Sequence, residues 1–293
     1  MSAHDGFPTA GAGPAAERHT AVVFSTDAEW AEHLVAFVRT GLERAEQVQY
    51  FADTTDPGQV MRTLGEHGID AASAARHGRL VVTTASRTYL AGPRFDPDAV
   101  VGLWFEAHAA ALAQGHSGLR AIGEMSWGAR ETAGAERLLE YELRMHHEVF
   151  DRIPLTAWCF YDRRLFPAES LKAVLGAHLT RLGPDEGADA GPALTVAPLA
   201  DRPGFRLSGS AGYESRAVTA SAAAAVAGST SPAITLDLSA LDHLEVAALA
   251  EIAHAAMRRP GPEPVRLLGA PASLIRMLDV FPELATGLEV AGR

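Results

Sequence analysis

The sequence has one cysteine, one lysine and no long apolar run, and each shortage excludes a class of protein. With Cys159 as the only thiol, no disulfide can form within the chain, which is typical of a reducing compartment. No stretch of about 18 apolar residues occurs, so we expect no membrane-spanning helix. Residues 1–17 lack the basic start and apolar centre of a signal peptide. We therefore expect a disordered tail there and a cytoplasmic protein.

Acidic residues outnumber basic residues in this sequence. The formal net charge is −11, and no run of lysine or arginine interrupts the acidic average. A nucleic-acid partner needs a basic face, so we expect no direct binding to nucleic acid. An apolar content of 47% with 21% charged residues is typical of a soluble globular protein. The 293 residues are enough for two domains, each with its own core.

Residues 18–182 alternate short apolar runs with helical patterns. Such an alternation predicts an α/β domain, with a parallel sheet and crossover helices on its faces. We expect strands at 21–24, 48–52, 80–84, 119–124 and 155–161. We expect helices from about 26, 57, 97, 133 and 167, the last two ending near 150 and 178.

The chain changes character at residues 183–193, where Gly, Pro, Asp and Ala follow no period and indicate a linker. A smaller α/β domain over 194–293 is expected to follow. Its strands are expected to begin near 194, 205, 233 and 264, and its helices to cover about 213–227, 244–259 and 271–280.

A phosphate loop is absent from the place where this architecture would carry one. The segment after the first strand reads FSTDAEW at 24–30, without the glycines and the lysine that surround a triphosphate. Asp27 and Glu29 would repel such a ligand. ATP hydrolysis by that route is excluded.

Ligands of open parallel sheets bind beyond the carboxyl ends of the strands, where this chain carries acids and aromatics. Each candidate has a structural alternative. Glu124 could cap a turn or pair with Arg120 or Arg163, Trp127 and Tyr161 could be core aromatics, and Cys159 could be a small buried hydrophobe.

No metal site is expected. His19, Cys159 and Glu124 could form one only if folding brought them together, and no C-x-x-C or H-E-x-x-H spacing is present. His146 and His147 are expected to diverge on their helix. No cofactor is expected, and no general acid/base pair or nucleophile elbow is evident.

Several ordered sequence blocks resemble the MEDS family (methanogen/methylotroph, DcmR sensory domain). They are His19 before the first strand, RTGLERAE at 39–46, GRL at 78–80, YLAGPRFDPD at 89–98, GLRAIGEMSW at 118–127, YE at 141–142 and CFYDRRLFP at 159–167. Phe24 and Ser25 depart from the aromatic context common in the family. The resemblance implies a RecA/KaiC-like core without its phosphate loop, which senses small hydrocarbon-like molecules. It implies these ligand-binding candidates: His19, Glu124, Trp127, Tyr141, Glu142, Cys159, Tyr161 and Asp162.

Residues 194–293 resemble the STAS fold of anti-sigma-factor antagonists, through FRLSGSAGY at 205–213, ITLDLSALDHL at 234–244 and PVRLLGAPASLIRML at 264–278. Where signalling members carry a phosphorylated D-S-S-G-L loop, this chain reads EVAAL at 245–249. The phosphorylation switch is therefore expected to be missing. We expect constitutive docking on a protein partner, with a structural or oligomerisation role as the alternative. The docking candidates are Glu245, Val246, Leu249 and Ile252.

These patterns together favour a regulatory protein that is not an enzyme. A small-molecule signal bound by the first domain would alter the access of the second domain to an anti-sigma-type kinase or another regulator. Two alternatives remain open. One is an enzyme that uses Glu124, Asp162 and Cys159; the other is a scaffold without a ligand. The sequence leaves the ligand, the partner and a possible homo-oligomer unidentified.

Overall fold

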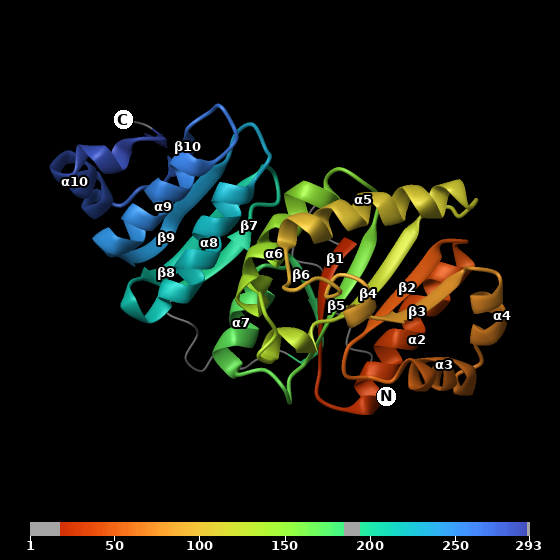
Figure 1. The fold of residues 1–293 in the computed structure, drawn as a ribbon. Coiled ribbons are helices and arrows are strands. Elements are labelled where there is room, and N and C mark those ends of the chain that lie inside the picture. The colour runs from red at the N-terminus through yellow and green to blue at the C-terminus, as the bar shows by residue number, and fades with distance from the viewer. Residues whose placement is uncertain (1–17, 185–193, 292–293) are drawn as a thin grey trace. The chain divides into compact units, whose positions relative to one another are not determined.

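The structure is a computed structural model that describes residues 18–184 and 194–291 (Figure 1). The described chain divides into two compact units. The first contains 18–136, Val149–Leu171 and 180–184, and the second contains Arg137–Glu148, Lys172–Leu179 and 194–291. The expected tail at 1–17 and most of the expected linker lie outside the described residues. The sequence did not predict that two segments before residue 182 would group with the second unit.

The first unit contains a six-stranded parallel sheet, as the alternation of strands and helices predicted. Its strand order is β3-β2-β4-β5-β1-β6. Five strands fall where they were expected, and the three-residue β6 pairs with β1 as an unpredicted sixth. The strands are β1 (His19–Phe24), β2 (Gln47–Ala52), β3 (Leu80–Thr84), β4 (Leu119–Glu124), β5 (Thr156–Asp162) and β6 (Thr180–Leu182).

Helices cover both faces of this sheet, and alternating residues of β2 face one set of helices or the other. Val48 and Tyr50 belong to a buried core with side chains of α2 (Asp27–Glu43), α3 (Pro57–Glu66) and α4 (Ala71–Arg76). Gln49 and Phe51 point to the opposite face, toward α5 (Pro97–Ala113). The helix starts follow the predicted caps: Thr26 forms a capping box with Glu29, and Asp56 and Asp96 each cap a helix that begins with proline.

The helix expected over 133–150 is broken into three parts, which corrects the prediction. A 3₁₀ turn (Ala135–Arg137) precedes α6 (Leu138–Met145), and a π-helical turn (His146–Phe150) follows it. Gly134 has a φ of 87°, and a Cβ there would clash with the Phe95 carbonyl oxygen, so a helix cannot include it. The π-helical turn also brings the rings of His146 and His147 to 4.6 Å between centroids, so these side chains do not diverge.

The second unit contains a five-stranded sheet of order β11-β10-β9-β8-β7. The pair β7–β8 is antiparallel and the other pairs are parallel. The strands are β7 (Leu194–Pro198), β8 (Gly204–Ala211), β9 (Thr235–Leu244), β10 (Val265–Leu268) and the unpredicted β11 (Leu288–Val290). The helices are α8 (Arg216–Gly228), α9 (Val246–Arg258) and α10 (Ala272–Val280), while α7 (Ala168–Gly176) precedes β6.

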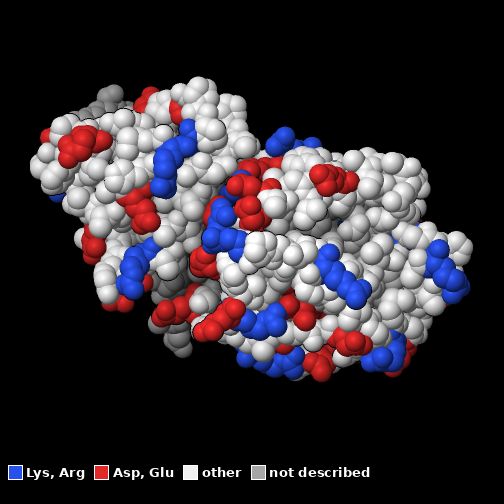
Figure 2. Space-filling model, in the orientation of Figure 1, with Lys and Arg blue, Asp and Glu red and all other residues white. Residues whose placement is uncertain are grey.

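Within the described ranges, no helix is both long and apolar enough to cross a membrane. On the face shown in Figure 2, the basic side chains (Lys and Arg) are interspersed with aspartates and glutamates and do not form a continuous stripe. The surface seen there agrees with the acidic composition.

Candidate functional site

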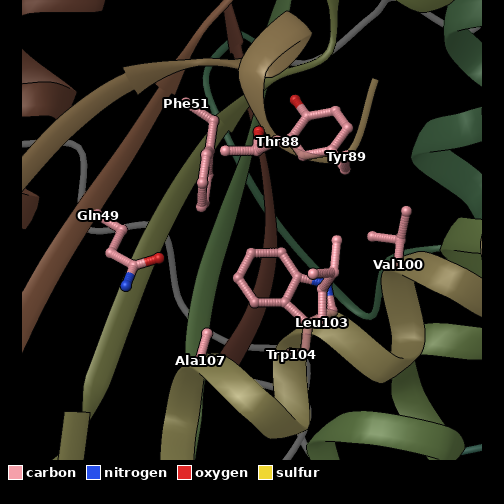
Figure 3. Close-up of a pocket in the computed structure, with 8 residues that line it drawn as sticks. All are labelled: Gln49, Phe51, Thr88, Tyr89, Val100, Leu103, Trp104 and Ala107. Atoms are coloured by element: carbon pink, nitrogen blue, oxygen red, sulfur yellow. The ribbon is translucent and has the colours of Figure 1, made fainter. Parts of the chain in front are cut away.

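A small apolar pocket lies in the first unit between β2 and α5 (Figure 3). Three aromatic rings form its walls. The Phe51 ring lies edge-on to Tyr89 at 5.7 Å and to Trp104 at 5.8 Å between centroids. The pocket is lined by Gln49, Phe51, Thr88, Tyr89, Val100, Leu103, Trp104 and Ala107.

The polar groups of three pocket side chains form hydrogen bonds within the protein. A ligand in the pocket would therefore contact mainly carbon atoms. The Thr88 hydroxyl donates to the carbonyl oxygens of Thr84 and Ala85 at 3.1 and 3.2 Å. The Tyr89 hydroxyl donates to the Glu124 carbonyl oxygen at 3.3 Å, and burial raises its pKa well above the usual value. The Gln49 amide donates to the Gln47 side chain at 2.9 Å.

The pocket volume of about 150 Å³ decides what can enter. Drug-sized ligands need roughly 300–1,000 Å³, so a nucleotide does not fit. An engineered apolar cavity of about 150 Å³ in another protein stays dry and binds benzene or xenon. The size and lining of this pocket therefore suit an apolar molecule of a few heavy atoms.

Glu124 ends β4 behind the pocket and is fully engaged by the protein. One carboxylate oxygen accepts a hydrogen bond from the Tyr50 hydroxyl. The other accepts from the backbone N–H groups of Asp53, Thr54 and Thr55 at 2.7, 2.9 and 3.1 Å. Burial raises the pKa of Tyr50, which keeps its hydroxyl a donor. Glu124 thus pairs with neither Arg120 nor Arg163; it fastens the loop after β2.

The backbone N–H groups at 53–55 form a ready anion-binding nest, which this carboxylate fills from within. The neighbouring Asp53 carboxylate accepts from the Ser126 hydroxyl at 2.6 Å and pairs with Arg130. Arg120 instead donates to Glu46 at 2.8 Å.

His19 and Cys159 form a second buried group on the neighbouring strands β1 and β5. The His19 Nε2 and Cys159 Sγ atoms are 3.5 Å apart, and the side chains are 2% and 7% exposed. The His19 ring stacks on Phe150 with centroids 4.7 Å apart. Burial lowers the pKa of His19 to about 3, so the imidazole is neutral near pH 7. Folding brings these two residues together, while Glu124 is held by other partners.

The aromatic candidates Trp127 and Tyr161, and the acidic candidate Asp162, make contacts within the first unit. Trp127 is fully buried and packs on Phe95 with centroids 4.4 Å apart, although it also lies beside the pocket residue Tyr89. Tyr161 is buried against Phe166. Asp162 caps the turn after β5 and accepts from the Arg164 side chain at 2.7 and 2.9 Å.

The remaining candidates lie in the second unit. Tyr141 and Glu142 are buried on α6, and a Glu142 oxygen lies 3.4 Å from His178 Nε2. Among the docking candidates, Leu249 and Ile252 are only 1% and 4% exposed, because they face the interior from α9. The structure therefore corrects their choice as docking residues and leaves Glu245 and Val246 at the surface.

Sequence reasoning missed the pocket residues and His178. The pocket draws on several separated segments, which no local pattern connects. Two signals were available: α5 is apolar around most of its circumference, and Tyr89 opens one of the family-like blocks. His178 lies at a helix end and belongs to none of the blocks.

A family model described as MEDS, the MEthanogen/methylotroph, DcmR Sensory domain, matches residues 18–179. The Transcriptional repressor DcmR of Methylorubrum extorquens is 24% identical over 162 residues, which cover 55% of this chain and 57% of that protein. The match thus spans little more than half the length of this curated relative. The family match includes the whole pocket and the residues His19, Glu142, Cys159 and His178.

Proposed function

The chain belongs to the MEDS family, and from that premise we propose that it is a sensory and regulatory protein whose first unit binds a small apolar molecule. The observation that carries this proposal is the pocket between β2 and α5, with its aromatic walls and its volume of about 150 Å³. A hydrocarbon-like signal matches both the lining and the size. The printed name of the relative, a transcriptional repressor, supports a regulatory role.

Binding of toluene by the full chain tests this proposal, with Trp104 as the fluorescent reporter in the pocket wall. The variant Ala107→Phe places a ring in the pocket. Ala109→Phe, on the exposed side of the same helix, is the matched control. We expect saturable binding in the wild type and in the control. We expect affinity to fall at least about tenfold in Ala107→Phe, equivalent to about 1.4 kcal/mol.

Two results would overturn the proposal. One is a wild-type chain without saturable toluene binding up to the solubility limit. The other is equal binding by Ala107→Phe and Ala109→Phe, which would place the ligand elsewhere. Circular dichroism of both variants identifies any loss of fold.

The second unit is proposed to be a STAS-like docking module without a phosphorylation switch. Supporting this, Glu245 is exposed as the residue before α9, and residues 245–249 carry no hydroxyl. Tyr213 is 68% exposed and stacks with Arg216, and Val246 is 41% exposed. A cytoplasmic regulator protein is the proposed partner of this surface, and the signal bound by the first unit would control its access.

A degenerate RecA-like core remains part of this proposal, and an enzyme remains the alternative to it. The three side chains considered for catalysis are each engaged: Glu124 by Tyr50 and the loop, Asp162 by Arg164, and Cys159 by His19. Their engagement favours the sensor. Turnover of a small substrate that is lost in Glu124→Gln would favour the enzyme instead. A scaffold without a ligand would be excluded by the toluene experiment.

A further inference from the structure

The amide group of the pocket residue Gln49 forms hydrogen bonds through only one of its two ends. Its side-chain nitrogen donates to Gln47 Oε1 at 2.9 Å. Among the residues that the structure describes, none donates to Gln49 Oε1. In Figure 3 this oxygen points toward the space between Phe51, Trp104 and Ala107. The pocket therefore contains one strong acceptor for which the protein supplies no donor.

A chain of side-chain amides fixes the orientation of Gln49. The side-chain nitrogen of the buried Gln47 donates to the Gly78 carbonyl oxygen at 3.0 Å and to Gln114 Oε1 at 3.1 Å. Both of its N–H groups are thus used, and Gln47 faces Gln49 with an oxygen that can only accept. Turning the Gln49 amide over would bring two oxygens together. The acceptor of Gln49 is therefore held toward the pocket.

We propose that the ligand of this pocket is a small alcohol, whose single hydroxyl donates to Gln49 Oε1. This inference rests on the proposed function and names the class of its ligand. A pure hydrocarbon would cover the amide oxygen and remove its water without replacing the hydrogen bond, which costs affinity. A hydroxyl restores that bond, while the rest of the molecule contacts the aromatic and aliphatic walls.

The lining of the pocket disfavours other ligands of similar size. None of the eight lining residues is charged, so an ammonium group would be buried without a counter-charge. A carboxylate has no donor and would face the partial negative charge of the amide oxygen. A neutral hydroxyl on an apolar body meets neither obstacle. The volume of about 150 Å³ limits that body to a few heavy atoms.

The test compares phenol with toluene, which have nearly the same size but differ in the presence of a donor. Isothermal titration calorimetry of the full chain measures both affinities. The variant Gln49→Leu removes the acceptor, and Gln59→Leu, at a half-buried position of α3, is the matched control. In Gln49→Leu we expect the affinity for phenol to fall about tenfold, equivalent to about 1.4 kcal/mol, and that for toluene to stay within about twofold. The control should bind both ligands as the wild type does.

The wild type alone provides a second test, which does not depend on the folding of a variant. It should bind phenol at least as tightly as toluene, whereas a pocket without an acceptor would favour toluene, because water solvates the phenol hydroxyl. Weaker binding of phenol than of toluene by the wild type would overturn the inference. So would a Gln49→Leu variant whose affinities for the two ligands change equally or not at all. These outcomes leave the proposed function standing, whereas a wild type that binds neither ligand saturably would refute the proposed function itself.

Discussion

Glu124 offers the sharpest test of how the first unit is held together. Glutamine keeps the shape of this side chain but replaces one acceptor oxygen with a donor. If the amide oxygen keeps the three N–H groups at 53–55, the NH₂ group faces the Tyr50 hydroxyl. Hydrogen bonds to a charged group are worth about 1.5–3 kcal/mol each and neutral ones about 0.5–1.5. Weakening three bonds and losing the fourth should lower the free energy of unfolding by about 3 kcal/mol.

Urea unfolding followed by tryptophan fluorescence measures this loss selectively. All 4 tryptophans of the chain, at 30, 104, 127 and 158, belong to the first unit. With an m-value of about 2 kcal/mol/M, the midpoint should fall by about 1.5 M. The control Glu136→Gln removes an ion pair with Arg94 whose side chains are 66% and 58% exposed, and it should cost less than about 0.5 kcal/mol. If Glu124→Gln also stays within about 0.5 kcal/mol, the carboxylate does not hold the loop.

Further substitutions test burial and backbone geometry. Leu249→Ala should lower the free energy of unfolding of the second unit by about 2–4 kcal/mol, because Leu249 is buried. The control Val246→Ala, at an exposed position, should change it by less than about 0.5 kcal/mol. Equal effects of the two substitutions in calorimetry would contradict the burial of Leu249. Gly204→Ala should lower the free energy of unfolding by at least about 1–3 kcal/mol, because φ is 146° and a Cβ would overlap the Thr235 carbonyl oxygen. An unchanged melting temperature would refute this close approach. Gly65→Ala in α3 should instead stabilise the first unit by about 0.5–1 kcal/mol in urea unfolding, because no atom lies near the added methyl group.

Local patterns were sufficient for most of the fold. The apolar runs at 80–84 and 119–124 are strands over those same residues, and the Asp-Pro pairs at 56–57 and 96–97 begin helices. Short strands at the sheet edges were missed, because three residues such as 180–182 are too few to show a period. The π-helical turn after α6 was also missed, since its sequence continues a helical pattern.

The site was less predictable, because its contacts depend on sheet order and on backbone groups. The Glu124 carboxylate was a candidate, yet three of its four donors are backbone N–H groups, which leave no mark in a sequence. His19 and Cys159 were both named, but their pairing required β1 and β5 to be neighbours. The pocket required α5 to lie over alternate residues of β2, which only tertiary packing determines.

Glu124 also connects two parts of the first unit, the pocket and the loop after β2. Its carbonyl oxygen holds the pocket residue Tyr89, while its carboxylate holds the loop at 53–55. In the proposed sensor, a ligand that shifts the Tyr89 ring would change the hydrogen bond between its hydroxyl and the Glu124 carbonyl oxygen. Under the proposed function, ligand binding beside Tyr89 would therefore be coupled to the position of the loop at 53–55.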